Sequence, residues 1–238
     1  MRGMMAQEVS LDENICQKDS AIMVDMKSEC KPITMSQKLV LFDFDGTIVD
    51  SFPVFLSFAS REGYLFDEGE VGVFRDLSMK QVIDKLGIPA WKIPFFAKKF
   101  QHYFKKASAD VRLVDGIGEA IRQLHEEGCI LGIVTSNSKS NVEAILEREG
   151  VLFFFDHVFS EWNVFGKAGP LKRITRYLDV AENEAWYIGD EARDVEAARE
   201  AGIQSIAVTW GFNSESALRA MRPTFLASHP DELSTLLR

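Results

Sequence analysis

Two aspartates that follow a short apolar run are the residues of this sequence best suited to chemistry. The run, Leu39–Phe42, has the length and composition of a strand buried on both faces. Asp43 and Asp45 follow at alternate positions, so in an extended chain both carboxylates point to the same side, and Gly46 allows a sharp turn after them. Such close carboxylates repel each other unless one is protonated or a cation lies between them, and Mg²⁺ suits oxygen ligands of this kind. A charged turn without a metal is the alternative for these two residues alone.

A second polar group closes the next apolar run. Thr135, Ser136 and Asn137 follow the run at 129–134, at the point where a helix should begin. A hydroxyl and free N–H groups at such a junction are suited to bind phosphate, although the same residues can simply cap the helix. Lys167 lies in a later loop, where a solvated surface lysine is the alternative.

A third group of acids follows the strand expected at 185–188. Asp190 comes directly after Gly189 at the strand end, and Asp194 falls four residues later, in the first turn of a helix. Asp194 could serve only to offset the helix dipole, whereas a metal ligand is the better interpretation of Asp190. Because parallel strands end at one edge of a sheet, all these polar groups should converge there.

The elements that must position these groups alternate along the chain. Strands are expected at 39–42, 129–134, 185–188 and 205–208, with a short one near 157–159. Helical periods at 117–128, 142–150, 170–178 and 195–201 lie between them. This alternation predicts an α/β fold: a Rossmann-like, doubly wound parallel sheet of about five strands with right-handed crossovers.

One segment interrupts that alternation. Residues 52–108 contain helical periods rich in aromatic residues, including stretches at 79–86 and 93–106, and Ser51 is placed to be an N-cap. We expect this insert to be a small helical cap domain over the site, with 37–51 and 109–238 forming the core domain. The alternative is that these helices simply cover the sheet. Residues 1–36 are polar without sustained periodicity, which predicts a disordered N-terminal tail.

Composition narrows the class of protein. The 238-residue chain has a net charge of −9, which disfavours nucleic-acid and membrane-surface partners. No apolar run approaches the roughly 20 residues needed to cross a membrane. The three cysteines share no C-x-x-C spacing, and the N-terminus carries acids rather than a signal pattern, so we expect a cytoplasmic protein with reduced thiols.

Taken in order, these motifs resemble a known family. The sequence D-x-D-G-T, then a strand-end Thr, then a Lys, then G-D-x-x-x-D is similar to the four signatures of the haloacid dehalogenase (HAD) superfamily. The resemblance covers Leu39 to Trp210, and the helical insert resembles the cap of its phosphoglycolate phosphatase-like branch. Members that cleave carbon–halogen bonds lack the second aspartate of D-x-D, so the presence of Asp45 favours phosphate chemistry.

The resemblance implies a role for each matching residue. Asp43 matches the nucleophile that forms an aspartyl-phosphate, and Asp45 matches the general acid/base. Thr135 matches the residue whose hydroxyl binds the phosphoryl group. Lys167 matches the lysine that offsets negative charge on the nucleophile and the phosphoryl oxygens. The further positions expected to contact phosphate are Gly46, Ser136 and Asn137. The expected Mg²⁺ ligands are Asp43, Asp45 through its main-chain carbonyl, Asp190 and Asp194.

Two positions leave alternatives open. Many relatives have Lys-Pro at the lysine motif, whereas this chain has Lys167 followed by Ala-Gly-Pro, so Lys172 is the second candidate. Arg75, in the insert, is a candidate for binding a substrate carboxylate, and its alternative is a surface ion pair with Asp76 or Glu70. The segment 209–213 follows the last expected strand and is a candidate border of the site.

These observations predict a Mg²⁺-dependent phosphatase of a small phosphorylated metabolite, with phosphoglycolate or a sugar phosphate as first guesses. A phosphomutase of the β-phosphoglucomutase type is the alternative, and the aromatic character of the insert favours hydrolysis over it. A phosphonatase would need a lysine of the insert, and neither Lys80 nor Lys85 is marked as buried. A non-catalytic HAD-like binding protein is disfavoured by the intact set of motifs. We expect a monomer or homodimer.

Overall fold

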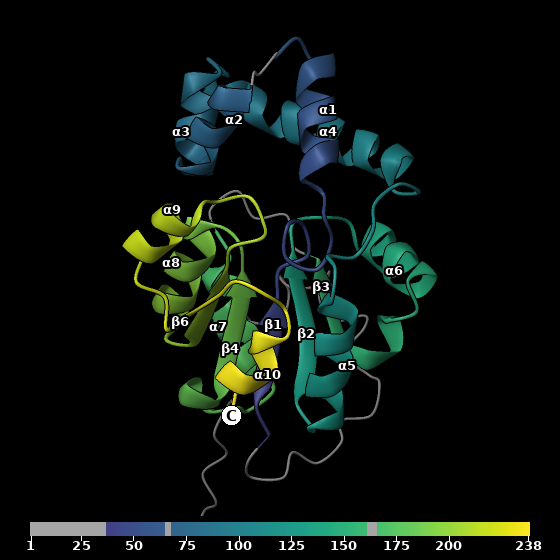
Figure 1. Ribbon diagram of the computed structural model, residues 1–238, viewed down its shortest axis with the longest axis vertical. Coiled ribbons are helices and arrows are strands. Elements are labelled where there is room, and N and C mark those ends of the chain that lie inside the picture. Colours follow the sequence, from purple (N-terminus) through teal and green to yellow (C-terminus); the bar gives the residue numbers. More distant parts are fainter. Residues whose placement is uncertain (1–36, 65–67, 161–165) are drawn as a thin grey trace, which may run out of the picture. The chain divides into compact units, whose positions relative to one another are not determined.

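A six-stranded parallel sheet forms the centre of the fold in the computed structural model, which describes residues 37–64, 68–160 and 166–238 (Figure 1). The predicted tail at 1–36 lies outside these ranges. The strand order is β3-β2-β1-β4-β5-β6. The strands are β1 Leu39–Phe42, β2 Ile130–Thr135, β3 His157–Ser160, β4 Ala185–Gly189, β5 Gln204–Val208 and β6 Phe225–Ala227. The predicted α/β class and parallel sheet are confirmed, and β6 is an additional strand.

Helices connect consecutive strands. Those of the sheet region are α5 Ile117–Glu126, α6 Lys139–Arg148, α7 Ala168–Tyr177, α8 Ala192–Ala201, α9 Glu215–Ala220 and α10 Glu232–Leu236. Those between β1 and α5 are α1 Phe52–Arg61, α2 Glu68–Arg75, α3 Met79–Lys85 and α4 Ile93–Ala107. Short 3₁₀ helices are η2 Ala90–Lys92, η3 Leu152–Phe154 and η4 Glu182–Glu184. Within the described ranges, no helix combines the length and apolar character needed to cross a membrane.

The register of β1 with its two neighbours decides which residues meet at the sheet edge. Phe42 lies opposite Ile133 of β2 and Ile188 of β4. The strand order reverses between β1 and β4, which is where open α/β sheets bind ligands. Asp43 therefore leaves β1 beside the ends of both neighbours, and its N–H donates to the carbonyl of Ile188 at 2.8 Å.

Alternate residues of β1 belong to two different apolar clusters. Val40 and Phe42 pack in a cluster that includes α5 and α6, whereas Leu39 and Leu41 pack in one that includes α7 and α8 (Figure 1). All four side chains are fully buried. Burial on both faces explains why β1 is a continuous apolar run, and it fixes the strand that carries the two aspartates.

An aromatic cluster holds α1 and α4 together. The ring of Phe58 lies 4.9 Å from that of Phe96, 5.3 Å from that of Phe100 and 5.5 Å from that of Tyr103. These four aromatic residues thus pack against one another between α1 and α4, and their type does not by itself indicate how a substrate is treated. The preference for hydrolysis must therefore rest on other residues.

Candidate active site

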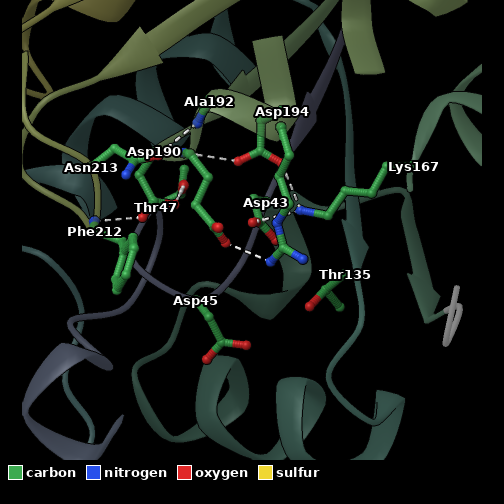
Figure 2. A network of polar contacts seen from close by, with 12 residues as sticks. Asp43, Asp45, Thr47, Thr135, Lys167, Asp190, Ala192, Asp194, Phe212 and Asn213 are labelled. Carbon is green, nitrogen blue, oxygen red and sulfur yellow. Dashed lines mark hydrogen bonds and ion pairs between the residues drawn. The ribbon is translucent and has the colours of Figure 1, made fainter. Parts of the chain in front are cut away.

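Three carboxyl groups meet at the carboxyl ends of β1 and β4. One oxygen each of Asp43, Asp190 and Asp194 lies within 4.8 Å of the others, and all three residues are buried (Figure 2). Asp43 and Asp190 follow their strands directly, whereas Asp194 comes from the first turn of α8. The Asp45 side chain is not part of this cluster among the described residues.

Lys167 connects two members of this carboxylate cluster. Its Nζ lies 2.6 Å from Asp43 Oδ2 and 2.9 Å from Asp194 Oδ1, and 5.4 Å from the centre of the Tyr187 ring. Burial alone would lower the pKa of Lys167, but the carboxylates of Asp194 and Asp43 outweigh it and raise that pKa. Lys172, the second candidate, is exposed on α7. Of the two candidates, Lys167 is therefore the one that contacts the carboxylate cluster.

The carboxylate cluster holds more negative charge than Lys167 balances. Burial raises the pKa of Asp43 to about 7, although Lys167 opposes the shift. Burial, together with the charges of Glu191 and Asp43, also raises the pKa of Asp190 well above its usual value. Oxygen ligands of this number and charge fit a hard divalent cation such as Mg²⁺, whose charge would favour the ionised carboxylates.

Asp190 is held on both oxygens. Thr47 Oγ1 donates to Asp190 Oδ1 at 2.7 Å, and the N–H of Phe212 donates to Oδ2 at 2.7 Å. Gly46, at φ +79°, and Gly211 pass so close to Asp190 that a Cβ at either position would collide with its side chain. The predicted turn at Gly46 is therefore also a close approach of the chain to Asp190.

Asp45 has its own set of hydrogen-bond donors. Asn137 Nδ2 lies 3.2 Å from Asp45 Oδ2, and the Ser51 hydroxyl also bonds this carboxylate. Burial raises the pKa of Asp45 to about 6, and these two hydrogen bonds oppose the shift. Ser51 occupies the N-cap position of α1 as predicted, but its side chain makes no capping bond to the helix. The nearby carboxylate takes the hydroxyl instead.

The end of β2 borders the site as expected. Thr135 is buried and its Oγ1 accepts the N–H of Asn137 at 3.0 Å, which leaves the hydroxyl proton for another acceptor. Ser136 is exposed, and its carbonyl accepts from Gln101 of α4 at 3.1 Å. Asn137 contacts both groups, because its main-chain N–H bonds Thr135 and its side-chain amide bonds Asp45.

The loop after β5 joins the site to the end of α2 and the residues just after it. Asn213 Nδ2 donates to the carbonyls of Arg75 at 3.0 Å and Leu77 at 2.9 Å, and its Oδ1 accepts the N–H of Ala192 at 2.8 Å. The N–H of Ser214 also donates to the Arg75 carbonyl, at 2.8 Å. We call these bonds the 213–214 anchor. The predicted border at 209–213 thus contacts both α8 and the helical segment.

The Arg75 side chain takes part in the same junction. Its Nη2 donates to the carbonyl of Gly211 at 2.6 Å, and its guanidinium lies 5.8 Å from the centre of the Phe52 ring. Asp76, which we considered as its partner, accepts instead from the hydroxyls of Ser214 and Ser216. In this conformation the Arg75 side chain links α2 to the loop after β5.

Replacing Asn213 should weaken the fold. In Asn213→Ala, two carbonyls and the N–H of Ala192 lose their partner, and unsatisfied buried groups of this kind cost roughly 1–3 kcal/mol. We expect the free energy of unfolding in urea to fall by about that amount. Ser216→Ala, which removes an exposed hydroxyl of the same region, is the matched control and should leave it within ~0.5 kcal/mol. An unchanged midpoint for Asn213→Ala would show that the anchor adds no stability.

Some site residues were missed by sequence reasoning. Thr47 and Glu191 stand inside the quoted motifs without an assigned role, and so does Arg193. Thr47 bonds Asp190, 143 residues away, and Glu191 bonds Asp194 within the same motif. From the sequence, only the position of these residues inside the motifs could have indicated a role for them. Glu191 donates its N–H to Asp194 Oδ2 at 3.0 Å, and its carboxylate pairs with Arg193.

Comparison with known proteins agrees with this geometry. Residues 40–208 match the model of the haloacid dehalogenase-like hydrolase family. The chain is 32% identical over 199 residues to a phosphoglycolate phosphatase from Synechococcus elongatus, covering 82% of this chain and 94% of the relative. It is 27% identical over 219 residues to an N-acetylmuramic acid 6-phosphate phosphatase from Pseudomonas aeruginosa, covering 85% and 96%.

The fold is also similar to solved structures. The structure of a predicted phosphatase from Clostridium acetobutylicum superposes with a TM-score of 0.71 at 23% identity, covering 84% of this chain and 98% of that one. Similarity at this identity indicates a shared fold. The family match over residues 40–208 and the relative at 32% identity establish that the chain belongs to the haloacid dehalogenase-like hydrolase family, in its phosphoglycolate phosphatase-like branch, and that it is an enzyme of the phosphatase type.

Proposed function

We propose that this protein is a Mg²⁺-dependent phosphatase that hydrolyses a small phosphate ester through an aspartyl-phosphate on Asp43. The observation that supports it most is the pairing of Lys167 with Asp43 and Asp194 beside Asp190. A binding protein without turnover gains nothing from burying these groups together, because burial of charges is costly. The Synechococcus relative makes phosphoglycolate the first candidate substrate.

Asp43 is proposed as the nucleophile. A carboxylate oxygen attacks phosphorus as the bond to the leaving alcohol breaks, and the phosphoryl group passes to Asp43. Lys167, 2.6 Å from this carboxylate, favours its ionised form and would offset charge on the phosphoryl oxygens. Water then releases inorganic phosphate and restores the carboxylate.

Asp45 is proposed as the general acid and then the general base. Burial raises the pKa of its carboxyl to about 6, which brings the protonated form closer to neutral pH and suits a group that must give a proton to the leaving oxygen. Once that proton has moved, the carboxylate can accept one from the attacking water. Asn137 and Ser51 orient the group for both steps.

The remaining residues are proposed to hold phosphate and metal. The Thr135 hydroxyl and the N–H of Ser136 would bind phosphoryl oxygens. The N–H groups of Gly46 and Asn137 would have to give up their present acceptors, the Val49 carbonyl and Thr135 Oγ1, to do the same. The metal ligands would be Asp43, Asp190 and the main-chain carbonyl of Asp45, with Asp194 supporting Lys167. When bound, Mg²⁺ would neutralise part of the charge on the phosphoryl oxygens.

We propose that α1–α4, within residues 52–108, act as a cap that selects the substrate. The 213–214 anchor attaches this segment to the loop that also bonds Asp190. Phosphoglycolate and N-acetylmuramic acid 6-phosphate, named in the two relatives, both carry a carboxylate. To bind such a carboxylate, Arg75 would give up its hydrogen bond to the Gly211 carbonyl. We also propose that the protein is located in the cytoplasm and that it is a monomer or a homodimer.

Release of inorganic phosphate from a panel of esters tests the function. The panel contains 2-phosphoglycolate, N-acetylmuramic acid 6-phosphate, glucose 1-phosphate and glucose 6-phosphate, each with Mg²⁺ and with EDTA. We expect Mg²⁺-dependent release, highest for an ester that carries a carboxylate. Conversion of glucose 1-phosphate to glucose 6-phosphate without release would instead indicate a mutase. No turnover of any ester would favour a binding protein.

Mg²⁺ should stabilise the protein directly. Because the cation would bind the folded carboxylate cluster and not the unfolded chain, a concentration of 100 times Kd should add about 2.7 kcal/mol to stability. For a domain of this size, that corresponds to a rise in Tm of roughly 5–10 °C, measured by differential scanning calorimetry. Asp190→Asn should lose most of the rise, whereas Asp50→Asn, an exposed acid nearby, should keep it. An equal rise in all three proteins would place the bound cation elsewhere.

A further inference from the structure

We propose that Arg193 is a substrate-binding residue of this site, whose guanidinium contacts a non-bridging oxygen of the phosphoryl group, and that Glu191 is the residue that positions it. This inference rests on the proposed phosphatase function. It adds a cation that is absent from the motif residues assigned above.

The position of Arg193 in the fold supports this role. It is the second residue of α8, which begins directly after the end of β4, and it lies between Asp190 and Asp194 in the chain. Those two residues are 1% and 2% exposed, whereas the Arg193 side chain is 47% exposed. Arg193 thus lies between two buried carboxylates in the chain, while its side chain remains accessible to a ligand.

Glu191 holds the guanidinium at that place. Its carboxylate, only 9% exposed, lies 2.5 Å from Nη2 of Arg193. The main-chain N–H of the same Glu191 is bonded to Asp194, so the pair is tied to the carboxylate cluster at its base. A guanidinium has five N–H donors in a planar fork, and a contact through one terminal nitrogen leaves other donors that can face an oxyanion.

The charge of Arg193 reaches the reacting groups. It lowers the pKa of Asp43, although burial dominates there, and it opposes the rise in the pKa of Lys167. The guanidinium is therefore close enough for its charge to act on both partners of the Asp43–Lys167 pair.

The charge balance of the site indicates why the positive charge of Arg193 would favour phosphate binding. Among the described residues, five carboxyl groups meet two basic side chains at this edge: Asp43, Asp45, Asp190, Glu191 and Asp194 against Lys167 and Arg193. A phosphate monoester adds up to two further negative charges. Even with a divalent cation bound, removal of Arg193 leaves the phosphoryl group in a site of strong negative excess, which should weaken its binding.

The test uses the Mg²⁺-loaded full-length protein and inorganic phosphate as the probe. Its affinity is measured by isothermal titration calorimetry for wild type, Arg193→Ala, Arg193→Lys and Glu191→Gln. We expect Arg193→Ala to weaken phosphate binding by roughly 10- to 100-fold, with a smaller loss in Arg193→Lys and Glu191→Gln. Arg176→Ala, which removes an exposed arginine of α7, is the control and should bind as wild type does.

Two further readouts separate a binding role from a structural one. Tm should change little in Arg193→Lys, while kcat/KM for the best ester falls in parallel with phosphate affinity. Phosphate affinity within twofold of wild type in Arg193→Ala would overturn the assignment, and so would a loss explained by unfolding. If wild type hydrolyses no ester, the proposed function fails, but the phosphate titration still decides the role of Arg193.

Discussion

Asp43→Asn is expected to reduce phosphate release by roughly 10⁴-fold or more, while the protein stays folded. The amide has no negative oxygen to attack phosphorus, so no covalent intermediate can form at this position. Its shape equals that of the carboxylic acid, and its oxygen can still accept the N–H of Phe44, as Asp43 Oδ1 does at 2.7 Å. Lys167 keeps Asp194 as a partner at 2.9 Å. The loss should therefore be chemical rather than structural.

Single-turnover assays with the best substrate of the panel would measure this effect, with Tm followed in parallel. Asp50→Asn is the matched control, since Asp50 belongs to the same stretch but is exposed. It should retain activity within about twofold of wild type. Residual activity of Asp43→Asn above a few per cent, after exclusion of deamidation by mass spectrometry, would remove Asp43 from the nucleophile's role.

Lys167→Met is expected to produce the second-largest effect, a loss of roughly 10²–10³-fold in kcat/KM. The methionine keeps the length and much of the apolar stem but supplies no charge to Asp43 or to the phosphoryl oxygens. It also leaves the buried carboxylates of Asp43 and Asp194 without their shared cation, and breaking a buried pair costs roughly 3–5 kcal/mol. The metal-free protein should therefore melt at a lower temperature than wild type.

Lys172→Met is the control that matters here, because Lys172 is the other lysine of the motif and is exposed. Steady-state kinetics and calorimetry on both variants, each with and without Mg²⁺, separate the two candidates. We expect the control to match wild type in both measurements. Equal losses of activity in the two variants, or a greater loss in Lys172→Met, would contradict the assignment of Lys167.

The convergence of the polar groups was predictable because it depends on strand order and polarity. Once 39–42, 129–134 and 185–188 are parallel neighbours, the residues that follow them must share one edge. The sequence also showed Lys167 as a candidate, but its choice over Lys172 required the contact with Asp43 and Asp194.

Several elements could not be predicted for local reasons. The strand β6 has three residues, of which Phe225 is exposed, so neither length nor alternation marks it. Helix α2 contains Gly69 and Gly72, which lower helix propensity, and its pattern is correspondingly weak. Helices α9 and α10, with six and five residues, are too short to show a period.

The roles of Ser51 and Arg75 depended on partners far along the chain or outside the expected pattern. Ser51 precedes a helix with proline in its first turn, which is the usual setting of a cap, but the carboxylate of Asp45 takes its hydroxyl. Arg75 bonds the carbonyl of Gly211, 136 residues away, and no sequence pattern encodes a carbonyl. Contacts of this kind become visible only when the fold is known.

The 213–214 anchor has a consequence for how enzymes of this architecture can diversify. On the side of the helical segment, Asn213 and the N–H of Ser214 bond only main-chain carbonyls, those of Arg75 and Leu77. Every amino acid presents the same carbonyl, so residues at these two positions can be exchanged without loss of these bonds. At position 75, mutation can thus explore new side chains while the attachment persists, whereas Leu77 also packs against the cluster of Phe74, Val82 and Phe212. A library randomised at 75, with Asn213 and Leu77 kept, should yield a high proportion of folded variants.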